Sequence, residues 1–469
     1  MERRLNQPVV DQNFRQGLPL RLLQRAGIDR AVGFTILGRG WTAIAGLVTL
    51  LLLTRFLSPV QQGYYVTFGS VLGLSVFFEL GLSVVLVQFT SHERAALEWT
   101  PEGLLSGQPE AKARLASLLR TSIIWYGVAA VFLVAIVLPL GIVFFNRHSN
   151  SGIAWQGPWI WIALVTGLNI ALTPALAIIE GCGLIAQIAR LQLWQNVLGS
   201  VLVWIALLTH WGLMTAPVTN TVCLISLIAW LWTKKRGFFL DMLRPAAHPA
   251  RIDWYGEVWP LQWKVGLSYI SGYFIFQMFN PILFATRGAA AAGQMGLSLA
   301  VMMTVTAVSI AWITTKASPF GTLVAQKNFA GLDRLFFPCL WQSWVLAAVG
   351  AAAVWGLAYG LHQWHFPISH RFLDPLPLGL LAIGAVANHG AFAQAAYLRA
   401  HKQEPFLWLA LGMATLVALS GLLFARPFGA VGMLSGYLFA CLLNLALSTH
   451  IFLQKRREWH GQTVAEPRA

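Results

Sequence analysis

Long apolar stretches alternate with short polar segments along the whole chain. A helix needs roughly 20 apolar residues to cross a hydrocarbon core of about 30 Å. The pattern predicts twelve such helices, at 34–57, 62–89, 119–145, 158–180, 193–212, 214–233, 258–284, 291–315, 338–360, 376–398, 405–425 and 429–452. We therefore predict an all-α polytopic membrane protein.

Similar pieces of sequence occur in the two halves of the chain. Thr54-Arg55 and Thr286-Arg287 each end a predicted span and are followed by a short glycine-containing turn and another apolar stretch. Six spans separate the two copies, so both have the same orientation in the membrane. Parallel repeats of this kind predict two six-helix bundles with a central cavity between them. The predicted units are a bundle at 31–233, a cytoplasmic linker at 234–256 and a bundle at 257–453.

The basic residues are distributed unevenly over the segments between the spans. With the N-terminus inside, the seven inside segments hold 25 of the 32 Lys and Arg residues and the outside segments hold 5. Cytoplasmic loops carry such an excess, which predicts an N-in, C-in topology. We expect 1–30 to be a basic amphipathic cytoplasmic segment and 454–469 to be a cytoplasmic tail.

Composition excludes several classes of protein. Hydrophobic residues make up 57% of the chain and charged residues 10%, whereas soluble domains carry about 25% charged residues and disordered chains carry more charge still. The net charge of +15 is spread over seven segments rather than one compact domain, so we expect no nucleic-acid partner. The chain has no CxxC, HExxH or Walker-type motif. We expect no cofactor and no enzymatic activity, and any transport would draw on a gradient or a partner reaction.

Several blocks of sequence resemble one family of transporters. They are Arg39, TRFLSPVQQGYY at 54–65, FFELGLSVVLVQFTS at 77–91, AGQMGLS at 292–298 and YLRAHKQEPF at 397–406. Together they resemble the bacterial polysaccharide-unit flippases of the multidrug/oligosaccharidyl-lipid/polysaccharide exporter superfamily. The resemblance covers nearly the whole chain.

The resemblance implies a V-shaped pair of six-helix bundles in the bacterial inner membrane. It implies movement of an undecaprenyl-pyrophosphate-linked oligosaccharide from the cytoplasmic to the periplasmic leaflet, for surface polysaccharides such as O-antigen lipopolysaccharide or exopolysaccharide. The implied partners are the lipid-linked oligosaccharide, the bilayer, a polysaccharide polymerase and a chain-length regulator. A proton or sodium ion is the implied coupling ion.

Charged side chains within spans are candidate functional residues, because a charge in the bilayer costs at least about 2.5 kcal/mol on insertion scales. Arg39, Arg55, Lys264 and Arg287 lie on the predicted first and seventh spans or at their ends. Guanidinium groups suit phosphate as planar forks of donors, and lysine acts as a point charge. The four side chains are therefore a candidate cradle for a pyrophosphate. The alternative is that they extend to the membrane surface as anchors.

Other polar residues in the spans leave two interpretations open. Glu79 is either an ion-pair partner of Arg39 or Arg55, or a gating or proton-linked residue. His389 is either a packing residue or a proton site. For four further polar residues we expect interhelical hydrogen bonds, with contact to a sugar as the alternative. They are Asn169, Gln187, Gln277 and Asn280.

Two rival functions follow from the same pattern. A multidrug/cation antiporter of the same superfamily needs acidic residues in its cavity, and Glu79 is the clearest buried acid. A membrane-embedded glycosyltransferase or polymerase needs catalytic acids or metal ligands in large outside loops. Here those loops are short, and Asp374 is the only acid predicted to lie outside.

Overall fold

The computed structural model describes residues 30–148, 152–244, 248–401 and 406–462. The predicted N-terminal segment lies outside these residues except for Arg30, as do parts of the predicted linker, of the block at 397–406 and of the tail. The first half contains α2 (Arg30–Phe56), α3 (Pro59–Leu72), α4 (Val76–Glu79), α5 (Leu82–Arg94), β1 (Leu97–Trp99), β2 (Leu105–Gly107), α6 (Pro109–His148), α7 (Gln156–Gly181), α8 (Ile185–Leu208), α9 (Val218–Trp230) and α10 (Arg236–Leu243).

The second half contains α11 (Trp259–Phe276), α12 (Phe279–Arg287), α13 (Ala289–Thr314), α14 (Ala317–Ala325), α15 (Phe329–Gln363), α16 (Pro375–Ala400) and α17 (Leu407–Gln462). Helices α2–α10 form one bundle and α12–α17 form the other, and α11 contacts both, through α4 and α5 on one side and α17 on the other. The two short strands form one antiparallel hairpin at an end of the first bundle.

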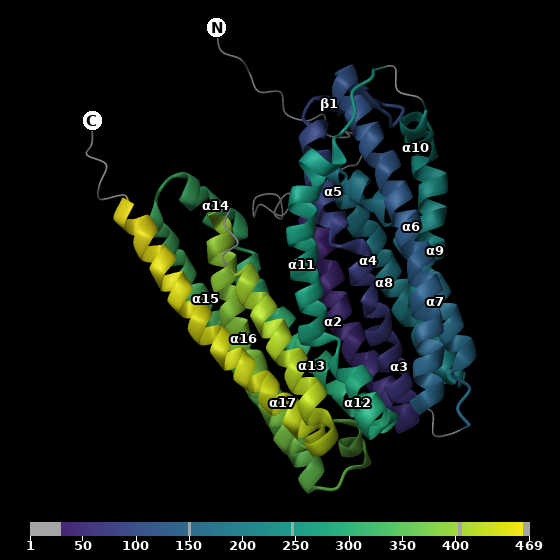
Figure 1. Ribbon diagram of the computed structural model, residues 1–469, viewed down its shortest axis with the longest axis vertical. Helices are drawn as coiled ribbons and strands as arrows, with labels where there is room; N and C mark the ends of the chain where they lie inside the picture. Colours follow the sequence, from purple (N-terminus) through teal and green to yellow (C-terminus); the bar gives the residue numbers. More distant parts are fainter. Residues whose placement is uncertain (1–29, 149–151, 245–247, 402–405, 463–469) are drawn as a thin grey trace, which may run out of the picture.

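The two bundles form a V (Figure 1). They meet where α3 and α12 of the two halves lie side by side, and α3 also packs along α13. They diverge toward the end that carries β1, α10 and α14. We call these the closed end and the open end. The orientation predicted from the basic residues assigns the open end to the cytoplasm, because the Lys/Arg-rich segments around 94–114, 234–244 and 316–334 lie there.

The described residues contain nine helices that are long and apolar enough to cross a membrane, or up to ten when the bent pair Pro59–Glu79 and Leu82–Arg94 counts as one span. Within α17 the backbone leaves the helical region at Gly429. Ser420 and Gly436 lie directly against each other, so α17 folds back as a hairpin of two antiparallel segments. The model is thus nearly all helical, and the count of twelve spans stays a prediction.

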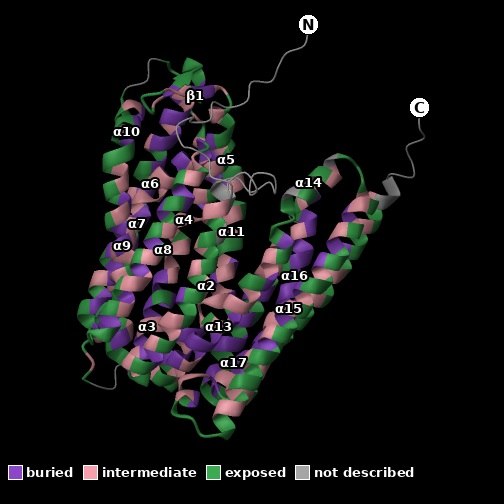
Figure 2. Ribbon diagram, turned by 180° about the vertical axis from the view of Figure 1, so that it is seen from behind, coloured by how far each residue is buried: buried purple, intermediate pink, exposed green. Residues whose placement is uncertain are grey.

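Exposed residues occur along both bundles (Figure 2), and many of them are large apolar residues. Val131 on α6 is 68% exposed and Leu357 on α15 is 67% exposed, which suits contact with lipid rather than water. Exposed tryptophans lie toward the two ends, at Trp232 and Trp408 near the open end and at Trp211 and Trp364 near the closed end. Such aromatic belts mark the two membrane–water interfaces.

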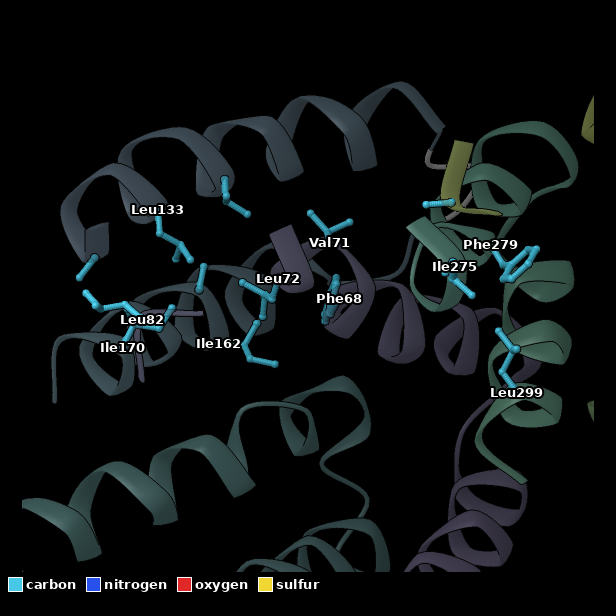
Figure 3. Packing of buried hydrophobic residues seen from close by; sticks show 14 of the residues in the cluster. Phe68, Val71, Leu72, Leu82, Leu133, Ile162, Ile170, Ile275, Phe279 and Leu299 are labelled. Carbon is cyan, nitrogen blue, oxygen red and sulfur yellow. The ribbon is translucent and has the colours of Figure 1, made fainter. Parts of the chain in front are cut away.

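A continuous apolar core joins the bundles toward the closed end (Figure 3). It runs from Phe68 and Val71 on α3 to Phe279 on α12 and Leu299 on α13. The ring of Tyr64 on α3 also meets Phe284 on α12 edge-on, with centroids 4.9 Å apart, a favoured aromatic geometry.

Candidate functional site between the two bundles

At the closed end, α3 and α13 pack against each other, and these are the corresponding helices of the two sequence repeats. We call this contact the seam. Gly63 lies so close to the Ala289 backbone that no side chain fits between them. A Cβ on Gly293 would lie 3.0 Å from the Gly63 nitrogen, and one on Gly296 would lie 2.6 Å from Val66 Cβ. Glycine permits this close approach of two backbones. The seam therefore shuts the space between the bundles at this end without using any charged pair of its own helices.

A cavity of about 320 Å³ lies between the bundles. Both bundles line it, through α2, α3, α8 and α9 on one side and α13 on the other. The polar and aromatic lining residues are Trp41, Thr42, Thr49, Tyr65, Asn196, Ser200, Thr219 and Thr304. None of the residues that line it carries a carboxylate or a formal charge.

Arg39 belongs to the face of α2 that lines this cavity. Thr42, Gly46, Leu50 and Leu53 line it, and they follow Arg39 at helical spacings of 3, 7, 11 and 14 residues, which place all five on one face. The Arg39 side chain is exposed, one turn beyond Thr42 on the side of the open end. By helical spacing it lies next to the cavity lining but is not part of it, and its role in binding a ligand stays a prediction.

Lys264 occupies the face of α11 that is directed toward the second bundle. Gly266 packs against Leu80, and Lys264 lies about 160° around the helix from Gly266 at roughly 100° per residue. Ser271 and Ile275 share the face of Lys264 and are buried where α11 nears α17. Nearer the open end the same face is uncovered, and the Lys264 side chain is exposed.

Neither Arg39 nor Lys264 has an ion-pair partner within the part of the chain that the structure describes. The Lys264 ammonium lies 5.8 Å from the centroid of the neighbouring Trp263 ring, which is a cation–π distance. Both cations are therefore exposed and have no ion-pair partner among the described residues.

Arg55 lies on a different face of α2. It continues the line of exposed apolar residues Leu37, Ile44 and Leu51, roughly opposite the face that lines the cavity. Arg39 and Arg55 are 16 positions apart in one helix, which corresponds to about 24 Å along the axis. One pyrophosphate therefore does not reach both side chains in this conformation.

Arg287 is held by backbone carbonyls at the closed end. Its guanidinium donates to the oxygens of Ala425 at 3.4 Å, Arg426 at 2.8 Å and Pro427 at 3.1 Å. These carbonyls end the first segment of the α17 hairpin, where a helix has unpaired acceptors. The four predicted cations thus divide into Arg39 and Lys264 toward the open end, and Arg55 and Arg287 at the closed end.

Glu79 ends α4 at a break within the predicted second span. The next two residues, Leu80 and Gly81, have φ values of 48° and 63°, and such left-handed backbone is unusual for leucine. The carboxylate is half-buried, and within the described residues it forms no ion pair with Arg39 or Arg55. The expected alternative of a structural ion pair is therefore not formed in this conformation.

Several predicted polar contacts join helices. Asn280 donates to Ser70 at 2.9 Å, and Ser70 donates to Gln277 at 3.3 Å. Asn169 donates to the carbonyl of Asn220 at 2.9 Å. His389 is fully buried, with its Nε2 2.5 Å from the Ser343 hydroxyl, so it lies in the packed interior of the second bundle.

Sequence reasoning missed the neutral polar lining of the cavity. Trp41, Thr42 and Asn196 come from helices that are more than 150 residues apart in the chain. A neutral polar side chain costs less free energy within a membrane span than a charged one does. The sequence therefore does not mark such a residue as functional in the way that it marks a charge. Only the position of Thr42 one turn after Arg39 could have suggested that it shares a cavity face.

Comparisons of this chain with solved structures all point to one fold. No protein-family model matches the sequence, and no curated protein matches it. Among solved structures, the lipid II flippase MurJ in an inward closed conformation matches with a TM-score of 0.64 at 11% identity, over 93% of this chain and 94% of that chain.

Two further solved structures match over most of their length. The MATE transporter VcmN of Vibrio cholerae matches with a TM-score of 0.56 at 13% identity, over 91% of this chain and 96% of that chain. A MOP superfamily transporter of Pyrococcus furiosus matches with a TM-score of 0.51 at 12% identity, over 92% and 95%. The chain therefore has the fold of the transporters of the MOP superfamily.

Proposed function

We propose that this chain is a transporter that flips an undecaprenyl-pyrophosphate-linked oligosaccharide repeat unit from the cytoplasmic to the periplasmic leaflet of a bacterial inner membrane. The observation that carries the proposal is the pair of exposed cations, Arg39 and Lys264, that have no ion-pair partner among the described residues. Arg39 lies one helical turn from Thr42 of the cavity lining, and none of the residues that line the cavity is acidic.

A pyrophosphate suits this pair of cations. The guanidinium of Arg39 can donate two parallel hydrogen bonds to phosphate oxygens, and Lys264 adds a mobile point charge. With no carboxylate lining the cavity, the attraction of these cations is not cancelled nearby. The polyprenyl chain stays in lipid while the headgroup enters between the bundles.

Transport then follows from alternating access. The substrate binds while the bundles are apart at the open end, and it leaves after the glycine seam of α3 and α13 separates. In this proposal Arg55 and Arg287 act later, as cations near the exit. Glu79, at the break in the second span, is the candidate gating or coupling residue for a proton or sodium ion. A polysaccharide polymerase and a chain-length regulator would use the product.

The rival functions fit the cavity less well. MurJ, a lipid II flippase, and MATE transporters both share this fold, so the fold alone does not choose between lipid-linked and drug substrates. An organic cation gains from a carboxylate in its pocket, and none of the residues that line this cavity has one. A glycosyltransferase or polymerase needs catalytic groups, and no cluster of three or more His, Cys, Asp or Glu side chains that could hold a metal occurs within the described residues.

The test is replacement of Arg39 and Lys264 with alanine, singly and together, in a strain whose surface glycan depends on this protein. We expect each single variant to reduce glycan export by at least tenfold at unchanged protein level. Arg190→Ala is the control, since Arg190 is an exposed arginine of the same bundle that does not line the cavity. Normal export by the double variant would refute the proposal.

A further inference from the structure

We infer that the cavity is a sugar subsite, and that it binds the sugar attached directly to the pyrophosphate. The inference rests on the proposed function and names the part of the substrate that this site recognises. The argument uses the polar groups of the cavity, their free hydrogen-bonding capacity and the position of Arg39.

The polar wall of the cavity is held in place before any ligand binds. The Trp41 indole donates to the Asn196 carbonyl at 3.3 Å and to the Ser200 hydroxyl at 3.0 Å. The Asn196 amide donates to the Thr42 hydroxyl at 3.4 Å. Trp204 donates to the Thr49 hydroxyl at 2.8 Å. These bonds fix α2 against α8, so a ligand meets groups that are already ordered and loses less conformational entropy on binding.

Capacity for further hydrogen bonds remains in this wall. The Asn196 amide nitrogen is engaged, and its side-chain oxygen has no donor among the described residues. The Thr219 and Tyr65 hydroxyls line the cavity and likewise have no hydrogen-bond partner among the described residues. One amide oxygen and two hydroxyls can therefore exchange hydrogen bonds with a ligand, as acceptor and as donor–acceptors.

This combination of groups selects a carbohydrate over other ligands. A sugar ring presents hydroxyls around its edge and C–H groups on its faces, which match the amide and hydroxyls and the indole of Trp41. An acyl chain would leave these polar groups unpaired, at a cost for each one that is buried. An organic cation finds no carboxylate here, and a free anion finds no charge deeper than Arg39.

The volume of the cavity and its spacing from Arg39 indicate which sugar of the substrate would bind in it. A volume of about 320 Å³ is at the small end of ligand pockets, which span roughly 300–1,000 Å³. It therefore suits one or two sugar rings rather than a whole repeat unit. Arg39 and Thr42 are one helical turn apart, about 5 Å along the axis. A phosphate on Arg39 thus places the sugar bonded to it beside Thr42 and Asn196, and the later sugars lie in the wider space between the bundles.

The test compares two probes on the purified full-length protein in nanodiscs. The first is farnesyl pyrophosphate, which has no sugar. The second is farnesyl pyrophosphate carrying one sugar on its terminal phosphate, made as a hexose and as an N-acetylhexosamine version. We expect at least one sugar-bearing probe to bind about tenfold more tightly than the sugar-free probe, as measured by calorimetry.

Substitutions in the wall then separate sugar binding from phosphate binding. Asn196→Ala and the isosteric Thr219→Val should each remove most of that tenfold gain and leave farnesyl pyrophosphate unaffected. Arg39→Ala should weaken both probes. The control is Thr415→Val, because Thr415 is an exposed threonine on α17 that bonds only to its own helix. Thr219→Val keeps the test valid if Asn196→Ala fails to fold.

Two results would overturn the inference and leave the proposed function intact. One is that no sugar-bearing probe binds more tightly than farnesyl pyrophosphate while Arg39→Ala still weakens binding. The other is that the wall variants weaken both probes equally. If neither probe binds the unmodified protein, the proposed function itself fails.

Discussion

Arg39 and Arg287 have the same side chain and the same predicted role, but their surroundings differ. Arg39 is exposed next to the cavity lining and has no ion-pair partner among the described residues. Arg287 donates to three consecutive carbonyls of the α17 hairpin. The same residue type in two corresponding spans is therefore exposed in one case and hydrogen-bonded to the backbone in the other, and the sequence does not distinguish these surroundings.

We predict that Arg287→Ala destabilises the protein. Hydrogen bonds to a charged group contribute about 1.5–3 kcal/mol, and the loss leaves carbonyls near the Gly429 kink without a donor. The melting temperature in detergent should fall measurably. Arg426→Ala is the matched control, because the neighbouring Arg426 contributes its carbonyl rather than its exposed side chain. Equal melting temperatures for the two variants would contradict the capping role.

At the scale of elements, the first turns of α6 hold the linker and the start of α11. Arg114 contacts Glu93 at 2.8 Å and Glu257 at 2.6 Å. The Ser117 hydroxyl accepts from the Ile252 amide at 2.9 Å, and Lys112 pairs with Asp241 at 2.8 Å. The open half of α11 therefore stays with the first bundle, although its sequence belongs to the second half of the chain.

This attachment predicts a pH dependence. The hydrogen bond from Arg114 lowers the pKa of the Glu257 carboxyl from an ordinary value of about 4.3. Glu257 therefore stabilises the fold above its ordinary pKa, and this contribution is lost as the pH falls through the lowered pKa. Melting temperatures between pH 7 and pH 3 should fall less for Glu257→Gln than for the unmodified protein. Glu98→Gln, at an exposed carboxylate of β1, should behave like the unmodified protein. The attachment is refuted if Glu257→Gln follows the same pH curve.

Sequence reasoning predicted the elements better than the contacts between them. The nearly all-helical membrane fold follows from apolar length, and the pairing of two bundles follows from the repeated sequence. The V is what the family resemblance implied. The roles of Arg39 and Lys264, singled out by their rare charge, stay predictions. The break at Leu80 could not be predicted, because nothing in the sequence distinguishes a leucine with left-handed backbone from a leucine within a helical span. The partners of Arg287 were also hidden, since they lie 138 to 140 residues away in the chain.

At the scale of the whole molecule, the seam of α3 and α13 must open for the proposed cycle to proceed. We predict that a disulfide across it stops transport. A Cβ on Gly296 would lie 2.6 Å from Val66 Cβ, so a shift of roughly 1 Å reaches the disulfide spacing of about 3.8 Å. Val66→Cys with Gly296→Cys should export glycan when reduced and lose export when oxidised.

The control for this experiment is a disulfide within one bundle. Ser420→Cys with Gly436→Cys joins the two segments of the α17 hairpin, which lie directly against each other and move together. Export should continue after this pair is oxidised. Continued export with the α3–α13 crosslink in place would show that the closed end does not open during transport.

The left-handed break at Leu80 and Gly81 divides one span between two sets of neighbours. The part toward the closed end, α3, packs on α13 of the other bundle, and the part toward the open end, α5, packs on α7 of its own bundle. Rotation about a few backbone dihedrals at the break lets one part turn while the other keeps its place. The break is therefore a candidate hinge within the span, and with such a hinge the two ends of the molecule need not move at the same instant. The transport cycle can then pass through an intermediate in which both ends are shut, and substrate is carried across without an open channel.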